Sequence, residues 1–311
     1  MHSLLSMIFK VSFVTAVIRD STPILFATLG AVIASKAGAI NIGIEGTMLT
    51  SALMGVIFSA YTGSVWIGIL AAIASGMIIS IVMWYFVFKL KTNIILTGIA
   101  INIISSGGTT FLLSTLTGDK GISTSLHSKV LPNIDIPIIN SIPVIGKIIS
   151  GQNIVVYIGI ICVILIEILF NKTSLGLRIK AVGEAPEAAE SVGIPVIKIK
   201  FIALMLSCIL SAIGGAYLSM GYVSWFSTDM TSGRGYIALA AREIAGNTGV
   251  GSLFASLLFG ASDTLANYFQ KLKVPVELVQ MTPYIITIIG FIVLSIVHDK
   301  KEKARKQKSI N

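Results

Sequence analysis

The sequence predicts an all-α fold, a polytopic integral membrane bundle of about 8–10 membrane segments, each needing about 20 apolar residues. Of 311 residues, 54% are apolar and only 12% are charged, whereas a soluble domain carries about 25% charged residues. The charges are also clustered, which leaves uncharged stretches long enough to cross a bilayer. These stretches are residues 46–88, 92–118, 148–166, 201–228, 244–262 and 278–297.

The chain opens on an apolar segment that differs from a cleaved signal peptide. Lys10 lies inside the apolar stretch of residues 1–20, and no small-residue cleavage site follows it. We expect this segment to be a membrane-entering lead-in that stays on the protein. The long run at residues 46–88 can hold two crossings, with residues 60–64 (AYTGS) as the turn between them.

The distribution of basic residues predicts the orientation. Lys and Arg concentrate at residues 89–91, in the connection at residues 171–200 and in the tail at residues 298–311. Because positive residues near membrane ends stay cytoplasmic, we expect a transmembrane domain over residues 1–297 with a cytoplasmic loop at 171–200 and a basic cytoplasmic tail at 298–311. Residues 117–152 then form an extracytoplasmic loop. The net charge of +9 follows topology and does not indicate nucleic-acid binding.

The orientation requires a further membrane-entering piece near the end of the chain. The segment from Phe201 leaves the cytoplasm and residues 278–297 return to it, so an even number of crossings must connect them. Only residues 244–270 obviously lie between. Residues 233–246 (GRGYIALAAREIAG) are too short and too polar for an ordinary span, and irregular helices at membrane depth occur where protein or a cavity surrounds them. We predict a short re-entrant helix there.

A similar interruption occurs in the first half, at residues 38–46 (GAINIGIEG). This stretch is either a surface turn between two membrane helices or a broken helix that lines a route through the membrane. Its likeness to residues 233–246 favours the second interpretation and predicts two structural repeats with short re-entrant helices. Discontinuous helices in matching positions are typical of transporter pathways.

The cytoplasmic connection predicts a helix of one to two turns. Pro186 suits the first turn of a helix, Glu184 and Glu187 suit the positive end of its dipole, and Gly193 suits its C-terminal end. The helix is either a solvated loop helix or an element that docks into a cytosolic partner.

The sequence contains no GxxxxGK[ST] phosphate loop, so any ATPase must be a separate polypeptide. An ion-coupled secondary transporter of a small polar solute is the alternative, with Glu45 and Glu243 as the plausible carboxylate pair. We expect no catalytic site, metal or cofactor.

Four motifs occur in order along the chain: GAINIGIEG, SLGLRIKAVGEAPEAAESVGI, GGAYLSMGYVSWFSTDMTSGRGYIALAA and LLFGASDTL. Together they resemble the permease subunit of bacterial ABC importers, within the branched-chain amino acid/ribose-like permease family. The chain is most similar to the simple-sugar and nucleoside branch, whose receptors are of the basic-membrane-protein type. The NIGIEG form is typical of nucleoside-type members.

The resemblance implies a transport subunit, not an enzyme, in the bacterial cytoplasmic (inner) membrane. Its implied partners are a cytosolic ATP-binding subunit, a second permease in a heterodimer, an extracytoplasmic substrate-binding lipoprotein and the lipid bilayer. The cytoplasmic helix is implied to be the coupling helix for the ATPase, and its residues are Glu184, Pro186, Glu187, Ala188, Ala189, Glu190 and Gly193. One departure is the Arg242–Glu243 pair and GNTGVG, where the family has an apolar pair and a GxWxPxG-like turn.

Polar residues in and near the two interruptions are candidates for the substrate pathway: Asn41, Glu45, Gly46, Tyr236, Arg242 and Glu243. Glu45 either contacts cargo or caps N–H groups of the helix that begins near Gly46, and we favour the cap. Asn41 either bonds a substrate hydroxyl or satisfies broken backbone. Tyr236 stacks on cargo or belongs to an interfacial belt.

Two further expectations concern other charged or polar residues of the membrane segments. Arg242 and Glu243 either line the pathway or pair with neighbours at the membrane edge, and adjacent positions on a helix do not face each other. Asp263, Glu167 and Asn102 are expected to bond between helices.

Overall fold

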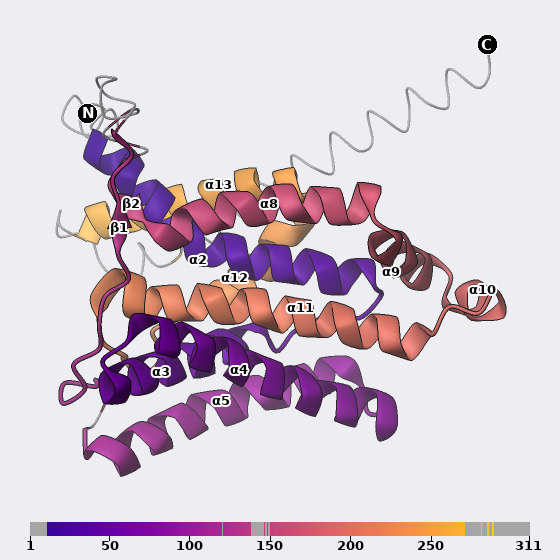
Figure 1. Cartoon of the computed structure of the whole chain (residues 1–311), viewed down its shortest axis with the longest axis horizontal. Coiled ribbons are helices and arrows are strands. Elements are labelled where there is room, and N and C mark those ends of the chain that lie inside the picture. The colour runs from indigo at the N-terminus through magenta and orange to yellow at the C-terminus, as the bar shows by residue number, and fades with distance from the viewer. Residues whose placement is uncertain are drawn as a thin grey trace.

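The computed structural model describes residues 11–119, 121–137, 146, 148, 150–270, 281, 285 and 288. Within them the chain forms a bundle of long helices that run side by side (Figure 1). Seven described helices are long and apolar enough to cross a membrane. This confirms the predicted helical membrane fold; the expected crossing at residues 278–297 lies almost entirely outside the described residues.

The first half of the bundle holds α2 (Val11–Lys36), α3 (Ile44–Thr62), α4 (Val65–Trp84) and α5 (Ile94–Thr117). A π-helical turn, Tyr85–Lys89, extends α4. The second half holds α8 (Ile154–Lys172), α9 (Ser174–Glu184), α10 (Pro186–Ser191), α11 (Val196–Ala216), α12 (Arg234–Ile244) and α13 (Gly249–Gln270). The π-helical segment Tyr217–Val223 extends α11.

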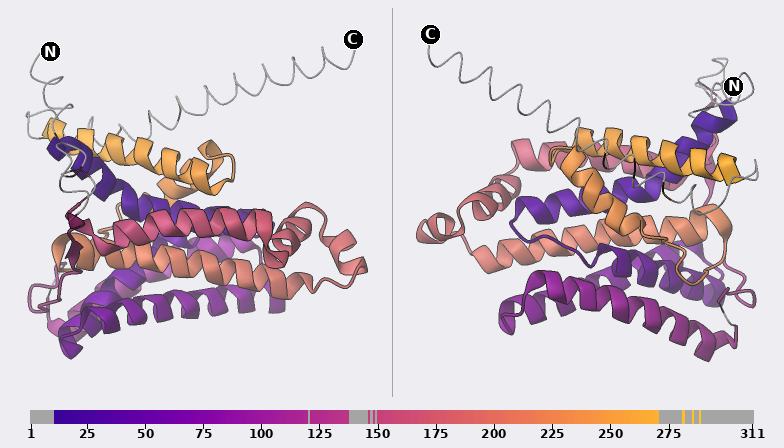
Figure 2. Two further views of the ribbon diagram at one scale, coloured as in Figure 1. Left: turned by 45° about the horizontal axis from the view of Figure 1, so that its top comes forward. Right: turned by 180° about the vertical axis from the view of Figure 1, so that it is seen from behind.

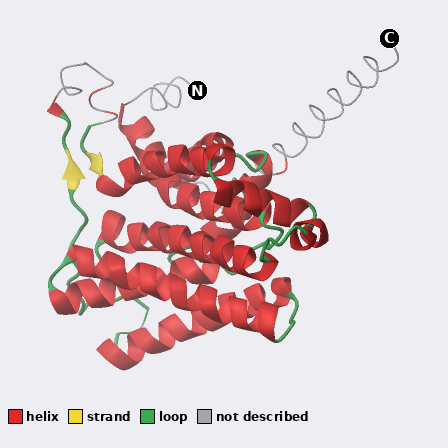
Figure 3. Ribbon diagram, turned by 45° about the vertical axis from the view of Figure 1, so that its right-hand side comes forward, coloured by secondary structure: helices red, strands yellow, loops and turns green. Residues whose placement is uncertain are grey.

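The two kinds of connection lie at opposite ends of the bundle. Strands β1 (Asn133–Ile134) and β2 (Gln152–Asn153) pair antiparallel at one end, where they appear in yellow in Figure 3. Helices α9 and α10 lie at the other end (Figure 1). We call these the outer end and the cytoplasmic end, following the orientation expected from the basic residues.

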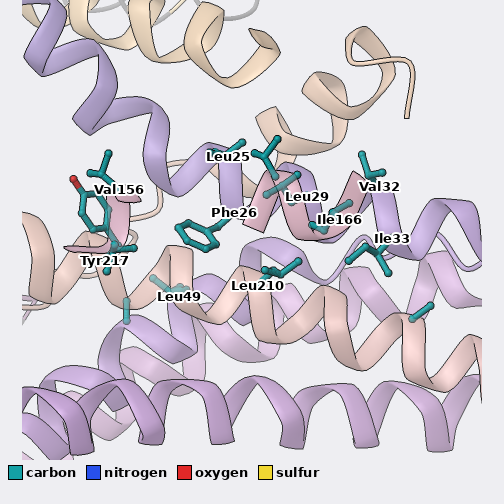
Figure 4. Close-up of a cluster of buried hydrophobic side chains, with 14 of the residues drawn as sticks. Leu25, Phe26, Leu29, Val32, Ile33, Leu49, Val156, Ile166, Leu210 and Tyr217 are labelled. Carbon is teal, nitrogen blue, oxygen red and sulfur yellow. The ribbon is translucent and has the colours of Figure 1, made fainter. Parts of the chain in front are cut away.

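Helix α2 forms the centre of the bundle. Its side chains from Asp20 to Ala34 are buried without interruption, because α8, α11, α12 and α13 all pack around it. Phe26 and Leu29 lie in the main apolar cluster, together with Ile166 of α8 and Leu210 of α11 (Figure 4). The peripheral helices α4, α5 and α8 instead expose large apolar side chains, as helices in contact with lipid do.

Both interruptions predicted from the glycines are present. Helix α2 ends at Lys36, and residues 37–43 run back along the bundle without helical structure before α3 begins. Ile44 packs against Ala27 and Ala31 of α2, roughly 10 Å inside the cytoplasmic end of that helix at 1.5 Å per residue. Helix α3 has 19 residues, so the break precedes a helix of ordinary length.

The second interruption enters the bundle from the outer end, whereas the first enters it from the cytoplasmic end. After the π-helical end of α11, residues 224–233 lead inward from the outer end, and the 11-residue α12 continues toward the cytoplasmic end. Helix α13 then runs back, with α12 and α13 in front of α2 when the molecule is seen from behind (Figure 2, right). The short helix predicted over residues 233–246 is therefore present as α12, whereas the crossing count from which it was predicted also depends on residues 278–297, which lie almost entirely outside the described residues.

Two asparagine caps provide a test of how the outer loop stabilises the bundle. Asn153 is buried, accepts from the Val155 N–H and donates to the Leu131 carbonyl. Asn93 is exposed and only caps α5. We expect Asn153→Ala to lower the free energy of unfolding by about 1–3 kcal/mol, because a buried carbonyl also loses its donor.

Thermal unfolding of the purified protein in detergent measures this difference. Asn93→Ala is the matched control, for which we expect a loss of about 1 kcal/mol or less. Equal losses for the two variants would contradict the assigned role of the Asn153–Leu131 contact.

Candidate functional site

The N-termini of α3 and α12 meet inside the bundle. Ile44 and Ala238 lie in one buried cluster with Ala27 and Ala31 of α2. The backbones of the two helices touch, since a side chain on Gly235 would place its Cβ 2.6 Å from the Glu45 Cα and N atoms. Only glycine permits this approach. The two interruptions of the chain therefore form one junction.

The Glu45 carboxylate holds this junction together. Its Oε1 accepts from the Thr231 hydroxyl at 2.6 Å and from the Gly233 N–H at 2.9 Å, and its Oε2 accepts from the Gly235 N–H at 2.6 Å. We expected Glu45 to cap its own helix. The N–H groups that it accepts from belong instead to the start of α12, almost two hundred positions away in the sequence.

The first turn of α3 is capped from a third helix. Asn102 of α5 accepts from the Gly46 N–H at 2.8 Å and donates to the Ile42 carbonyl at 2.9 Å. The same amide nitrogen contacts the Tyr236 hydroxyl of α12 at 3.0 Å. As expected, Asn102 bonds between helices, and it links both sides of the junction.

The electrostatics explain why an acid stands there. The free N–H groups at a helix N-terminus carry a partial positive charge, and two such ends converge at Glu45. In this partly buried place, each N–H group left without an acceptor would cost about 1–3 kcal/mol. One carboxylate supplies acceptors and an opposing charge at once.

A second polar contact holds the other side of α12. Arg234 forms an ion pair with Asp263 of α13 at 3.4 Å, and Thr264 of α13 donates to Asp20 of α2 at 2.9 Å. A cavity of about 330 Å³ lies beside them, lined in part by Trp225. Helix α12 is thus tied to α3 and α5 on one side and faces α2 and α13 on the other. Asp263 bonds between helices as expected, and Glu167 of α8 does so by accepting from the Val250 N–H at 3.1 Å.

The junction gathers Glu45, Gly46 and Tyr236 from the proposed pathway residues. Tyr236 is 49% exposed, so its ring is available at the surface of the junction. Asn41 lies elsewhere: it is buried and donates to the Ser207 hydroxyl of α11 at 3.0 Å.

The Arg242–Glu243 pair lies at the cytoplasmic end of α12. The two side chains form an ion pair with each other, which corrects the expectation that adjacent positions do not pair. The long Arg242 side chain reaches its neighbour although their Cβ atoms diverge. Arg242 is buried, and its Nε and Nη1 atoms have no hydrogen-bond partner among the described residues.

The cytoplasmic connection folds as two short helices. Pro186 opens α10, and Glu187 lies in its first turn. Gly193 has φ +84°, and its N–H donates to the Glu190 carbonyl at 2.9 Å. Glu184 differs from expectation because it is the last residue of α9.

The other side chains of α10 divide by exposure. Ala189 is buried, whereas Pro186, Glu187, Ala188 and Glu190 are exposed. The helix therefore presents an acidic outer surface and keeps one small side chain against the rest of the loop.

Helix α9 rests on the turn that follows α2. A Cβ on Gly38 would lie 3.4 Å from the Gly183 Cα, and a Cβ on Gly183 would collide with the Lys36 carbonyl. Backbone therefore touches backbone where the cytoplasmic loop meets the segment that leads to Glu45.

Sequence reasoning missed Thr231 and the N–H groups that follow it. Residues 231–235 read TSGRG, a small polar residue followed by glycines immediately before a helix. That pattern marks a helix start whose donors need an acceptor, and Glu45 is the acid that meets them.

Comparison with known proteins places this site in a family. Residues 13–292 match the family described as branched-chain amino acid transport system / permease component. The guanosine ABC transporter permease protein NupQ of Bacillus subtilis is 32% identical, over 90% of this chain and 91% of its own length. The nucleoside ABC transporter permease protein NupC of Lactococcus lactis is 30% identical, over 86% of this chain and 87% of its own.

A relative named for a sugar has a similar sequence identity to this chain. The putative glucose ABC transporter permease protein of Haloferax volcanii is 30% identical, over 87% of this chain and 82% of its own. Among solved structures, PsaBC from Streptococcus pneumoniae in complex with Fab matches with a TM-score of 0.55 and 15% identity. That match covers 94% of this chain and 95% of the other, and it supports the fold alone.

The Glu45 junction predicts a graded loss of stability. Glu45→Gln keeps one acceptor oxygen, so one N–H of Gly233 or Gly235 loses its partner, and we expect a loss of about 1–3 kcal/mol. Thr231→Val removes a donor and leaves the carboxylate with both N–H groups, so its effect is smaller.

Thermal unfolding in detergent measures both variants. Glu190→Gln, on the exposed surface of α10, is the control for loss of a carboxylate. If Glu45→Gln unfolds at the temperature of the parent protein, the carboxylate does not hold the junction.

Proposed function

The chain belongs to the branched-chain amino acid transport system permease component family, and we propose that it carries nucleosides into the cell. It is the membrane-spanning permease subunit of an ATP-binding cassette importer, a multi-pass protein of the cytoplasmic membrane and not an enzyme. Such a permease works with an ATP-binding subunit and a substrate-binding protein.

The names of the relatives support nucleosides as the cargo. Two of the relatives at 30% identity or more are named for guanosine or nucleosides, and one is named for glucose. The NIGIEG form at residues 41–46, typical of nucleoside-type members, points the same way. Ribose and related sugars are the second candidate class.

The junction of α3 and α12 is the part of this chain best suited to line the route. It joins the two interrupted segments, and matching discontinuous helices border the cargo pathway in many transporters. Tyr236 exposes an aromatic ring that can stack on a base, and its hydroxyl, which accepts from the buried Asn102 amide, can still donate its own hydrogen. Glu45 acts as a positioning residue, because Thr231, Gly233 and Gly235 occupy its oxygens.

A second permease completes the pathway in this proposal. Bacillus subtilis has two relatives named as guanosine ABC transporter permease proteins, and this chain covers 91% of one and 72% of the other. Lactococcus lactis has two relatives named as nucleoside permeases, with 87% and 73% covered. In each pair, this chain spans most of the length of one relative and about three quarters of the other. We therefore expect it to be the shorter member of such a pair and to form a heterodimer with a longer permease.

The coupling element in this proposal is α10. Its exposed acids, Glu187 and Glu190, lie at the cytoplasmic end, and Val192 just beyond the helix is 74% exposed. An acidic helix with an exposed apolar side chain suits a groove on the ATP-binding subunit. At the outer end, the loop of residues 117–152 is the proposed contact for the substrate-binding lipoprotein.

Uptake measurements test the cargo. We expect cells expressing this chain with its partner subunits to accumulate labelled guanosine and uridine but not glucose, and to lose uptake when ATP is depleted. A deletion strain sets the background. Uptake of glucose or ribose that excess nucleoside does not compete with would contradict the nucleoside assignment.

Substitution of Tyr236 tests, in the same uptake assay, whether the junction lines the pathway. We expect Tyr236→Ala to reduce nucleoside uptake at least about tenfold, a loss of about 1.4 kcal/mol or more in transition-state stabilisation, and Tyr236→Phe to retain most of it. Trp66→Ala is the control, since Trp66 is 55% exposed on α4. Normal uptake by the Tyr236→Ala variant would contradict the proposal that the junction lines the pathway.

Charge reversal on α10 tests the coupling role. We expect Glu187→Arg to leave the permease folded but to uncouple uptake from ATP hydrolysis, because the introduced arginine would be repelled by a basic docking groove that attracts the native acid. ATPase activity and uptake are measured in membrane vesicles, with Lys91→Glu at the other cytoplasmic turn as the control. If Glu187→Arg supports uptake with normal coupling, α10 does not dock the ATPase.

A further inference from the structure

An open apolar groove lies between α8 and α11 at the cytoplasmic half of the bundle. Its volume is about 450 Å³. Its floor is at α2, which lies between the two helices in Figure 1, and includes the buried Ile33 side chain, labelled in Figure 4. The walls are lined by Cys162, Leu165, Ile166, Ile168, Leu169, Leu206, Ile209 and Leu210. Leu165 and Ile168 are about half exposed, so the groove opens sideways, to the surroundings of the bundle.

The groove faces away from the proposed pathway. Ile33 forms its floor, whereas Ile24 of α2 packs in a cluster with Ala241 of α12. Ile24 and Ile33 are nine positions apart, roughly two and a half helical turns, which places them on opposite sides of α2. Figure 2 agrees, since α12 and α13 cover the rear of α2.

Basic residues stand at the cytoplasmic end of the groove. Thr173 and Leu175 form this end. Lys172 lies on the same side of α8 as Leu165 and Ile168, seven and four positions earlier, and is exposed. Arg178, one turn beyond Leu175 on α9, is exposed too.

The dimensions match one leaflet of a bilayer. From Cys162 to Thr173 the groove follows α8 for about 16 Å at 1.5 Å per residue, close to half of the roughly 30 Å hydrocarbon thickness. It therefore begins near the membrane centre and ends at the cytoplasmic headgroups, beside fixed positive charge.

We propose that this groove is a binding site for an anionic phospholipid of the cytoplasmic leaflet. One acyl chain lies on Ile33 between α8 and α11, and the phosphate lies near Lys172 and Arg178. The lining, which is apolar apart from Thr173 and the Cys162 thiol, accepts a hydrocarbon chain but no polar cargo. The two cations favour an anionic headgroup, because basic residues near the membrane surface attract anionic lipid.

The site also explains a packing feature. Helices α8 and α11 both pack on α2, yet they diverge enough to leave Ile33 at the floor of an open groove. A bound acyl chain would fill this gap and pack against both helices. Lipid beside the exposed side of α5, in contrast, would contact only the outer surface of one helix.

Photolabelling tests the proposal on the full chain, purified with its partner subunits and placed in nanodiscs. The probe is phosphatidylglycerol with a diazirine on one acyl chain, and mass spectrometry locates the labels. We expect labels concentrated on the groove residues of α8 and α11, displaced by excess phosphatidylglycerol and not by phosphatidylcholine. Lys172→Gln with Arg178→Gln should reduce this labelling at least about fivefold, and Lys198→Gln, an exposed basic residue of α11, should leave it unchanged.

A second variant separates loss of the site from loss of the fold. Leu206→Trp fills the groove and should lower labelling by either lipid, whereas Leu96→Trp on exposed α5 should not. Equal labelling of α5 and the groove, or equal competition by both lipids, would overturn the proposal. A disulfide or bifunctional crosslink from Cys162 to another subunit would overturn it too, because a protein would then cover the groove.

Discussion

The Glu45 carboxylate is the constraint on which the arrangement of this bundle depends. It accepts hydrogen bonds from the Thr231 hydroxyl and from the N–H groups of Gly233 and Gly235. These bonds join the start of α12 to the start of α3. In lipid, an interrupted helix is stable only if its free N–H groups find partners inside the protein. Asn102 meets the same need for Gly46. Two breaks that would each be costly alone become tolerable because they meet.

This junction also determines how the parts of the molecule divide their roles. Helix α2 and its neighbours form a close-packed centre, and the junction adds a polar region beside it that reaches the surface at Tyr236. On the opposite side of α2 lies the groove between α8 and α11, whose lining is apolar apart from Thr173 and the Cys162 thiol. A permease needs both: a polar route that cargo can follow and an apolar exterior that the bilayer solvates.

Much of the fold could be predicted from the sequence, because hydrophobic length and the distribution of Lys and Arg are local properties. The short α12 followed from the crossing count, and Pro186 and Gly193 marked the ends of α10. The partners of Glu45 could not be predicted, since they depend on which distant backbone lies beside it. The partner of Asn41, which is Ser207 in the core, could not be predicted either, because a side chain's type does not reveal which way its helix or loop faces.

The contact between Gly38 and Gly183 gives the cytoplasmic loop a direct mechanical connection to the junction. Side chains can absorb a displacement by changing rotamer, but two backbones in van der Waals contact cannot. A push on α10 that moves α9 must therefore also move the turn after Lys36. Seven residues later the chain reaches Glu45 and, through it, α12. The absence of two side chains thus brings the cytoplasmic loop into direct backbone contact with the segment that leads to the Glu45 junction.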